Sequence, residues 1–269
     1  MKRLDDATLS KLHNLELVAM DEIDRVCRDN GITYFLDSGT LLGAIRHKGF
    51  IPWDDDVDIG MMREDYDRFI SIAPSYFDSD KYFLQTHESE PAYTNFHAKV
   101  RIENTLYPQK GSMKYTHRGI MIDIFPFDYL PDNYDDAVKY LHKVRRIRRL
   151  NNTRFREKSI KGVLGHIKHY AAKLLPKSFC RYLFETACKK YNDTKYVTCF
   201  SYRMARTQDI LFATEDIIPV KKIIFEDREY FQVNNPDAFL REMYGDYWKI
   251  PPAKDCYCHV EEDIVFEMS

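Results

Sequence analysis

The chain has 269 residues, 44% of them hydrophobic, which is enough for one large domain or two small ones with a sizeable core. Its formal net charge of −2 offers no overall attraction to nucleic acid, and its six scattered cysteines fit neither a secreted disulfide framework nor a structural zinc site. The first residues contain no apolar core of a signal peptide, and no apolar run is long enough to predict a membrane span. We therefore expect a reduced, cytosolic protein.

The first predicted element is a helix over residues 6–30. Apolar residues recur along it at steps of three and four, at Leu12, Leu15, Ala19, Ile23 and Val26. Asn30 and Gly31 predict its end. We expect this helix to be scaffold and assign it no chemistry. A first core strand is predicted over 33–36, and a short helix over 41–46.

A turn of small residues joins this strand to the short helix, and it consists of Ser38, Gly39 and Thr40. Free backbone N–H groups at such a helix start can bind phosphate. Arg46 follows, with His47 and Lys48 after it. These three groups either balance the charge of the acidic residues that follow or, in the case of Arg46, contact a phosphate of the substrate.

Four aspartates stand close together, at Asp54, Asp55, Asp56 and Asp58. Two carboxylates about 4 Å apart repel by roughly 4 kcal/mol at an effective dielectric near 20, so the cluster predicts a bound cation or a solvated acidic loop. Apolar residues at 57, 59 and 61 alternate with it, which predicts a half-buried strand with Asp56 and Asp58 on one face. Carboxylates on such a strand favour Mg²⁺, with Mn²⁺ as the alternative.

Three other aspartate motifs fit less well. An EF-hand loop beginning at Asp54 needs glycine at the position of Ile59 and glutamate at the position of Asp65. A DDxxD diphosphate motif fits the spacing but works on a helix, whereas this stretch predicts a strand. A glycosyltransferase DxD motif also holds a metal and a nucleotide diphosphate. A phosphate turn some fifteen residues before paired aspartates instead favours the nucleotidyltransferase fold.

A helix is predicted over 63–73, and two further strands over 82–86 and 96–102. Three basic residues share one face of the second strand, at His97, Lys99 and Arg101. The pattern indicates either a solvated edge or a phosphate-binding face, and for the second alternative Lys99 is our choice.

The apolar stretch 120–126 predicts another strand, and Asp123 lies in its middle. A carboxylate in such surroundings is costly to bury unless it is paired, hydrogen-bonded or bound to a metal. Nucleotidyltransferases commonly use a third carboxylate on a neighbouring strand, and Asp123 is the natural candidate. Asp128 is a weaker one because we expect it to follow the end of the strand and Pro126.

Residues 139–177 differ in composition, with thirteen Lys or Arg and a single acidic residue, Glu157. Apolar periodicity predicts an amphipathic helix at the start of this segment and a second amphipathic stretch over 163–175. The charge indicates a solvated face or docking on anionic lipid, at about 1 kcal/mol per basic residue near the surface. The arginines expected to contact lipid are Arg145, Arg146, Arg148 and Arg149. Nucleic-acid binding is disfavoured because no recognisable nucleic-acid motif accompanies the charge.

The last third predicts helices over 177–191 and 237–244 and short strands near 196–200 and 223–231. An aromatic loop, YGDYWKIPP, follows. Its rings at Tyr244, Tyr247 and Trp248 either lock the C-terminal segment onto the core or form part of a cage for a quaternary ammonium ion, for which Trp53 is an equal candidate.

The stretch SGTLLGAIRHKGFIPWDDDVDIGM closely resembles the signature of the LicD family. These nucleotidyltransferase-fold proteins include bacterial phosphocholine transferases, and the fukutin-related ribitol-phosphate transferases resemble them. The segments GIMIDIFPFD and YGDYWKIPP resemble the family as well, so that the resemblance spans nearly the whole chain and is least specific over 131–220. His259 matches a position in the family's C-terminal tail, with no role that we can assign.

The resemblance implies an α/β (α+β) fold in which a mixed sheet of nucleotidyltransferase type is flanked by helices and carries a helical basic insertion. We predict a catalytic core over 1–135, completed by the basic and C-terminal residues 136–269. The resemblance and the charges together imply a metal site at Asp56, Asp58 and Asp123. The substrate would then be bound by Ser38, Gly39, Thr40, Arg46, Lys99 and Trp53.

The implied activity is transfer of phosphocholine from CDP-choline to a sugar hydroxyl of a cell-surface glycan, a teichoic acid or lipopolysaccharide precursor carried on lipid at the inner membrane face. One alternative keeps the chemistry with CDP-glycerol, CDP-ribitol or CDP-ethanolamine. Another is a nucleotidyltransferase that releases pyrophosphate. A third is a non-catalytic lipid- or glycan-binding module, which the intact Asp56, Asp58 and Asp123 disfavour.

Overall fold

The computed structural model describes residues 3–109, 115–155, 174–202, 208–252, 256 and 258–267, with the backbone alone for 150–155 and 177. These residues form two compact units, one of Met1–Pro126 with Glu215–Ser269 and the other of Phe127–Thr214. Strand β5 (Met121–Leu130) belongs to both. From the sequence we predicted a catalytic core over 1–135 that residues 136–269 complete. This division stays a prediction.

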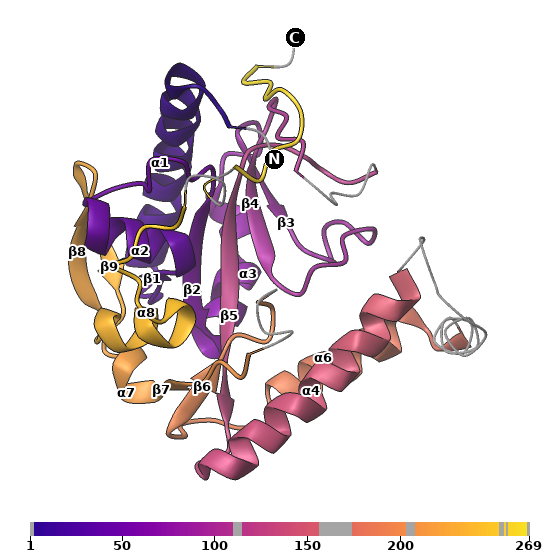
Figure 1. The fold of residues 1–269 in the computed structure, drawn as a ribbon. Coiled ribbons are helices and arrows are strands. Elements are labelled where there is room, and N and C mark those ends of the chain that lie inside the picture. The colour runs from indigo at the N-terminus through magenta and orange to yellow at the C-terminus, as the bar shows by residue number, and fades with distance from the viewer. Residues whose placement is uncertain are drawn as a thin grey trace. The chain divides into compact units, whose positions relative to one another are not determined.

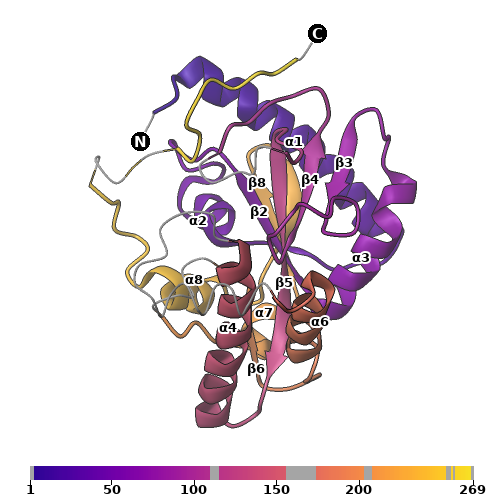
Figure 2. The same ribbon diagram turned by 90° about the vertical axis from the view of Figure 1, so that its right-hand side faces the viewer.

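The first unit is a sheet flanked by helices. Its elements before β5 are α1 (Asp6–Asp29), β1 (Phe35–Leu36), α2 (Ser38–His47), β2 (Val57–Met62), α3 (Arg63–Tyr76), β3 (Tyr82–Gln85) and β4 (Ala98–Ile102). Its later elements are α7 (Thr214–Ile217), β8 (Lys221–Phe225), β9 (Arg228–Gln232) and α8 (Pro236–Tyr244). The strands follow the order β1-β2-β5-β4-β3, with α2 and α3 on opposite sides (Figures 1 and 2). The predicted α/β class is therefore confirmed.

The predicted N-terminal helix is confirmed as α1. Asp5 caps it by accepting the N–H of Thr8, and its apolar stripe is buried. The stretch predicted as one strand near 223–231 is instead the hairpin β8–β9, which turns at Glu226 with a φ of 56°. Two strands replace one because this left-handed residue reverses the chain.

Register places the candidate carboxylates on neighbouring strands. β1 pairs antiparallel with β2, and β2 is followed in the sheet by β5. On the other side of β5, Lys99 of β4 stands opposite Asp123. The strand that begins just before Asp58 and the strand that carries Asp123 are thus adjacent in the sheet.

The second unit contains α4 (Tyr134–Phe155), α6 (Lys177–Cys188), β6 (Tyr196–Thr198) and β7 (Phe212–Ala213). Strand β5 does not end at Pro126, as predicted, but runs on to Leu130 and pairs there with β6. Pro126 is tolerated because it falls between the ladder to β4, which reaches Ile124, and the ladder to β6, which begins at Asp128. Asp128 is consequently a buried strand residue.

Two of the arginines expected to face lipid are internal to the second unit. Arg145 is buried and bonds to Asp209 and to the carbonyl of Gln208. Arg148 donates to three consecutive carbonyls, those of Phe200, Ser201 and Tyr202. Their guanidinium groups donate hydrogen bonds to backbone carbonyls that lie far along the chain. The prediction that these two arginines contact lipid is therefore wrong. The amphipathic stretch predicted over 163–175 lies outside the described residues up to 173.

Among the helices that the structure describes, none combines the length and apolar character required to cross a membrane.

Candidate functional site

The turn before α2 is held in an unusual backbone conformation. Asp37 is fully buried and caps α2 by accepting the N–H of Ser38. Ser38 itself has a φ of 48°, a region that non-glycine residues rarely occupy. A Cβ atom at Gly39 would lie 2.7 Å from a carboxylate oxygen of Asp54, so only glycine lets the helix start approach this aspartate so closely. The predicted phosphate turn and the predicted acidic cluster are therefore in contact.

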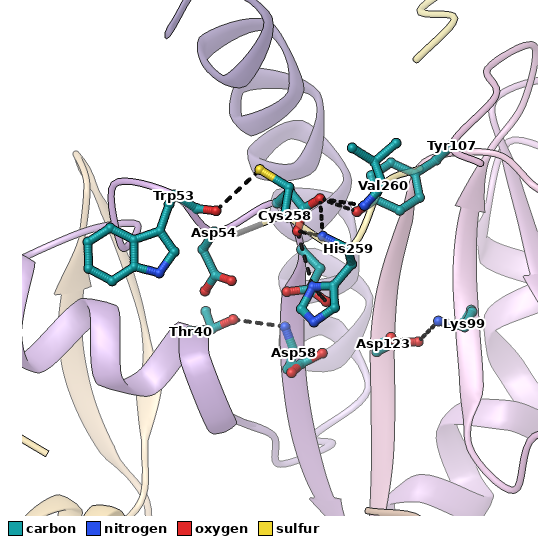
Figure 3. A network of polar contacts seen from close by, with 12 residues as sticks. Thr40, Trp53, Asp54, Asp58, Lys99, Tyr107, Asp123, Cys258, His259 and Val260 are labelled. Carbon is teal, nitrogen blue, oxygen red and sulfur yellow. Dashed lines mark hydrogen bonds and ion pairs between the residues drawn. The ribbon is translucent and has the colours of Figure 1, made fainter. Parts of the chain in front are cut away.

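Two hydrogen bonds fix the start of α2 against the start of β2. The N–H of Asp58 donates to the hydroxyl oxygen of Thr40 at 2.8 Å, and the N–H of Asp37 donates to the carbonyl of Asp58 at 3.0 Å. Figure 3 shows Thr40 and Asp58 joined in this way. Thr40 thus positions the acidic strand, and its hydroxyl proton remains able to donate to a phosphate.

Three carboxyl groups of the cluster resist ionisation. Burial, followed by the charge of Asp56, raises the pKa of Asp54, and burial followed by Asp56 and Asp123 raises the pKa of Asp58. Burial also raises the pKa of Asp56 to about 6, although His259 opposes this. Among the described residues, Asp58 has no hydrogen-bond or ion-pair partner for its carboxylate. At Asp54 and Asp58, loss of hydration, followed by repulsion from neighbouring carboxylates, thus disfavours the charged forms.

Asp55 differs from its neighbours because its carboxylate is already saturated. It is fully buried and accepts the hydroxyl of Tyr107 at 2.5 Å and the backbone N–H groups of His259 and Val260 at 2.7 and 3.1 Å. Burial opposes ionisation, but the hydrogen bonds from His259 and Tyr107 hold the pKa of Asp55 below its ordinary value. Asp55 therefore anchors the C-terminal segment.

Asp123 is buried and paired with basic groups of β4. Its carboxylate forms an ion pair with Lys99 and lies 3.3 Å from Nε2 of His97. Burial disfavours its charge, yet Lys99 and His97 together lower the pKa of Asp123. Lys99 and Arg101 are both buried, so the alternative of a solvated edge is wrong. Figure 3 shows the ion pair of Lys99 with Asp123.

The remaining candidates border the cluster. Arg46 donates to the carbonyl of Tyr247 at 2.6 Å and so joins α2 to the aromatic loop. Trp53 precedes Asp54 in the chain, and its ring makes a T-shaped contact with that of His47. The hydroxyl of Tyr247 is fixed by Asp237 of α8.

Sequence reasoning missed several groups of this site. Helix α1 was expected to be scaffold, yet Nε2 of His13 lies 2.8 Å from the carbonyl of Asp54. Glu16 of the same helix is buried, and neither of its carboxyl oxygens has a hydrogen-bond partner among the described residues. Burial and then the charge of Asp56 raise the pKa of Glu16. In the sequence, the one sign of this role was that Glu16 lies on the apolar face of α1.

The arrangement can hold a cation against a phosphate. Ligand atoms of four residues lie within 4.8 Å of one another, at Asp54, Asp55, Asp56 and His259. Buried carboxylates with raised pKa values gain most from a positive ion, since it removes both their repulsion and their desolvation cost. The helix start beside them offers backbone donors to an anion. The carboxylates could therefore bind the cation, and the backbone N–H groups could bind the phosphate.

The start of α2 thus contacts one aspartate that precedes β2 and one that lies within it. A family profile described as LicD/FKTN/FKRP, nucleotidyltransferase domain, matches residues 31–161. The lipopolysaccharide cholinephosphotransferase LicD of Haemophilus influenzae is 30% identical over 265 residues, which cover 95% of this chain and 96% of that protein. The chain therefore belongs to the LicD family and is a LicD-type phosphotransferase.

Shorter matches join the chain to eukaryotic relatives. The human ribitol 5-phosphate transferase FKRP is 57% identical over 35 residues, 13% of this chain and 7% of that protein. The mouse ribitol-5-phosphate transferase FKTN is 41% identical over 49 residues, 18% of this chain and 11% of that protein.

Proposed function

We propose that the chain transfers phosphocholine from CDP-choline to a sugar hydroxyl of a lipid-linked cell-surface glycan precursor. The observation that carries this proposal is the partly buried acidic cluster in contact with the helix start of α2. The nearly full-length similarity to a lipopolysaccharide cholinephosphotransferase supports choline as the alcohol. The same site is compatible with CDP-ribitol, CDP-glycerol or CDP-ethanolamine, and the similarity to ribitol 5-phosphate transferases favours ribitol among these.

The proposed cofactor is Mg²⁺, or Mn²⁺ in its place. Carboxylates of Asp56 and Asp58 would hold it, with Asp123 as the third group, since these ions prefer hard oxygen ligands. Asp56 precedes β2 and does not lie within the strand as predicted, whereas Asp58 and Asp123 are strand residues. Asp54 has the same lack of compensating charge and is a further candidate. When bound, the ion would neutralise the pyrophosphate of the donor and hold it for in-line displacement.

The chain's own groups would orient the donor. The backbone N–H of Gly39 and the hydroxyl of Thr40 would face the phosphate, and Lys99 would add positive charge from β4, whereas the N–H of Ser38 is already donated to Asp37. A sugar hydroxyl attacks the phosphorus that carries the alcohol, the new O–P bond forms, and the bond to the CMP oxygen breaks. A carboxylate of the cluster accepts the hydroxyl proton. The contribution of the protein is mostly position and electrostatics, as is usual for phosphoryl transfer.

A lipid-linked acceptor requires the enzyme to reach a membrane surface, and the exposed basic side chains of α4 are suited to anionic lipid. The exposed members are Lys143, Arg146 and Arg149, with Lys139 one turn earlier. They follow the helix at steps of three and four, so they share one face. This row replaces Arg145 and Arg148 of the sequence-based expectation, which bind groups within the second unit.

The test is mass spectrometry of products formed from CDP-choline, CDP-ribitol, CDP-glycerol, CDP-ethanolamine and CTP with a lipid-linked glycan extract as acceptor. The proposal expects CMP and a phosphocholine-bearing glycan. CMP release from another CDP-alcohol alone would change the donor and keep the chemistry. Pyrophosphate release from CTP would replace the proposal by conventional nucleotidyl transfer.

A further inference from the structure

The C-terminal segment carries a histidine whose side chain enters the acidic cluster. Nδ1 of His259 lies 3.1 Å from a carboxylate oxygen of Asp55 and 3.3 Å from one of Asp56. Figure 3 shows its ring beside Asp58, at the point where β2 begins. The cluster and this histidine are separated by about two hundred residues of sequence, so the fold alone brings them together.

Asp56 depends on this contact for its orientation. Asp56 precedes β2, so its backbone does not take part in the hydrogen bonds that pair this strand with its neighbours. Within the described parts of the chain, His259 is the only polar group paired with its carboxylate. Its side chain is only 14% exposed, so water cannot readily replace that partner.

Asp55 fixes the ring of His259 in turn. Its carboxylate accepts the backbone N–H of His259 and of Val260, and Nδ1 of the same histidine. Backbone and side chain of one residue are thus bound to a single buried carboxylate, which leaves the ring little freedom. The raised pKa of His259, about 9, has the same cause, namely the hydrogen bond to Asp55 and then the charge of Asp56.

We infer that His259 is a positioning residue, which Asp55 holds so that it orients the Asp56 carboxylate toward the bound divalent cation. This inference rests on the proposed function, because it assumes a cation at the cluster. A partner that orients a ligating carboxylate typically contributes about 10–100-fold to metal affinity. The C-terminal segment is then a working part of the site rather than an attached tail.

Other contacts hold the C-terminal segment in place without the imidazole of His259. A substitution of His259 therefore tests the orientation of Asp56 and not folding. Leu106 and Val265 exchange two backbone hydrogen bonds, and the N–H of Glu261 donates to the carbonyl of Pro108. Val260 also packs into a buried apolar cluster with Leu12 and Tyr107 of the first unit. None of these contacts uses the side chain of His259.

The experiment measures Mn²⁺ affinity of the metal-free full chain by electron paramagnetic resonance of the free ion, without any donor. We expect His259→Ala to weaken binding about 10–100-fold. We expect His259→Asn to stay within about threefold of the unchanged chain, because its amide nitrogen occupies the place of Nδ1 and keeps the donor. His142→Ala, which removes an exposed histidine paired with Asp209 in the other unit, is the matched control.

Each outcome is decisive. Unchanged or tighter Mn²⁺ binding by His259→Ala would overturn the inference, because the orientation of Asp56 would then not depend on the imidazole. Equal losses in His259→Ala and His259→Asn would also overturn it, because the donor at the Nδ1 position would then be irrelevant. Absence of Mn²⁺ binding by the unchanged chain would instead refute the cation of the proposed function.

Discussion

Replacing Asp56 by asparagine should stabilise the metal-free protein near neutral pH. Burial raises the pKa of Asp56 from 3.8 to about 6, so the folded state holds its proton more tightly than the unfolded chain does. A raised folded-state pKa gives stability that is complete below pH 3.8 and is lost as the pH rises through about 6. The difference between these two values corresponds to about 3 kcal/mol.

Asp56→Asn removes this penalty without a change of size. At pH 7.5, in the presence of a chelator, we expect the variant to gain up to about 3 kcal/mol in the free energy of unfolding. The gain corresponds to a Tm higher by roughly 6–12 °C, at about 2–4 °C per kcal/mol for a domain of this size. Near pH 4 the two proteins should be nearly equal. The measurement is chemical and thermal denaturation followed by circular dichroism across this pH range.

Saturating Mg²⁺ or Mn²⁺ should remove most of this difference in stability. A ligand at one hundred times its Kd stabilises the folded state by about 2.7 kcal/mol, and the variant should lose most of this gain. Asp80→Asn, at an exposed turn, is the matched control and should change neither quantity. An Asp56→Asn protein that is no more stable than the unchanged chain in chelator at pH 7.5 would refute the reasoning, as would a difference that grows toward pH 4.

Four further changes test the site and its surroundings. Asp58→Asn should abolish turnover in the product assay while the circular dichroism spectrum stays unchanged, and substantial activity would remove Asp58 from the metal site. Asp123→Asn leaves the buried Lys99 without its partner and should cost about 3–5 kcal/mol in denaturation experiments, whereas adding Lys99→Met should recover most of that loss; two independent losses would show that the pair is not coupled. Glutamine at the exposed basic positions of α4 should reduce co-sedimentation with anionic vesicles and leave stability unchanged, and equal vesicle binding would make this row a solvated face. These positions are Lys139, Lys143, Arg146 and Arg149. By contrast, Arg145→Gln should destabilise the second unit because it breaks the bonds to Asp209 and Gln208.

The sequence by itself determined the local part of the site. The turn at Ser38–Thr40 and the aspartates before β2 lie within twenty residues, and their structure depends on small residues, apolar alternation and a helix start. These patterns act over one or two elements, so composition and spacing are sufficient to predict them. The helix α1 and most strand positions followed from the same periodicities.

Register decided what the carboxylates and basic groups do. Asp123 was a plausible metal ligand and Lys99 a plausible phosphate ligand from the sequence, but the pairing of β4 with β5 places them opposite each other. No periodicity within either strand carries this information. A one-residue difference in register would have separated them.

The roles of chemically equivalent residues were also beyond the sequence. Asp55 is indistinguishable from Asp56 in the motif, yet Asp55 is saturated by Tyr107 and by the backbone of His259 and Val260. The four arginines of α4 look alike in composition, yet loop carbonyls bury two of them. Which member of a cluster is free depends on segments that arrive from far along the chain. Only the tertiary structure fixes those segments, because long-range contacts are selected by packing of the whole core and leave no local pattern.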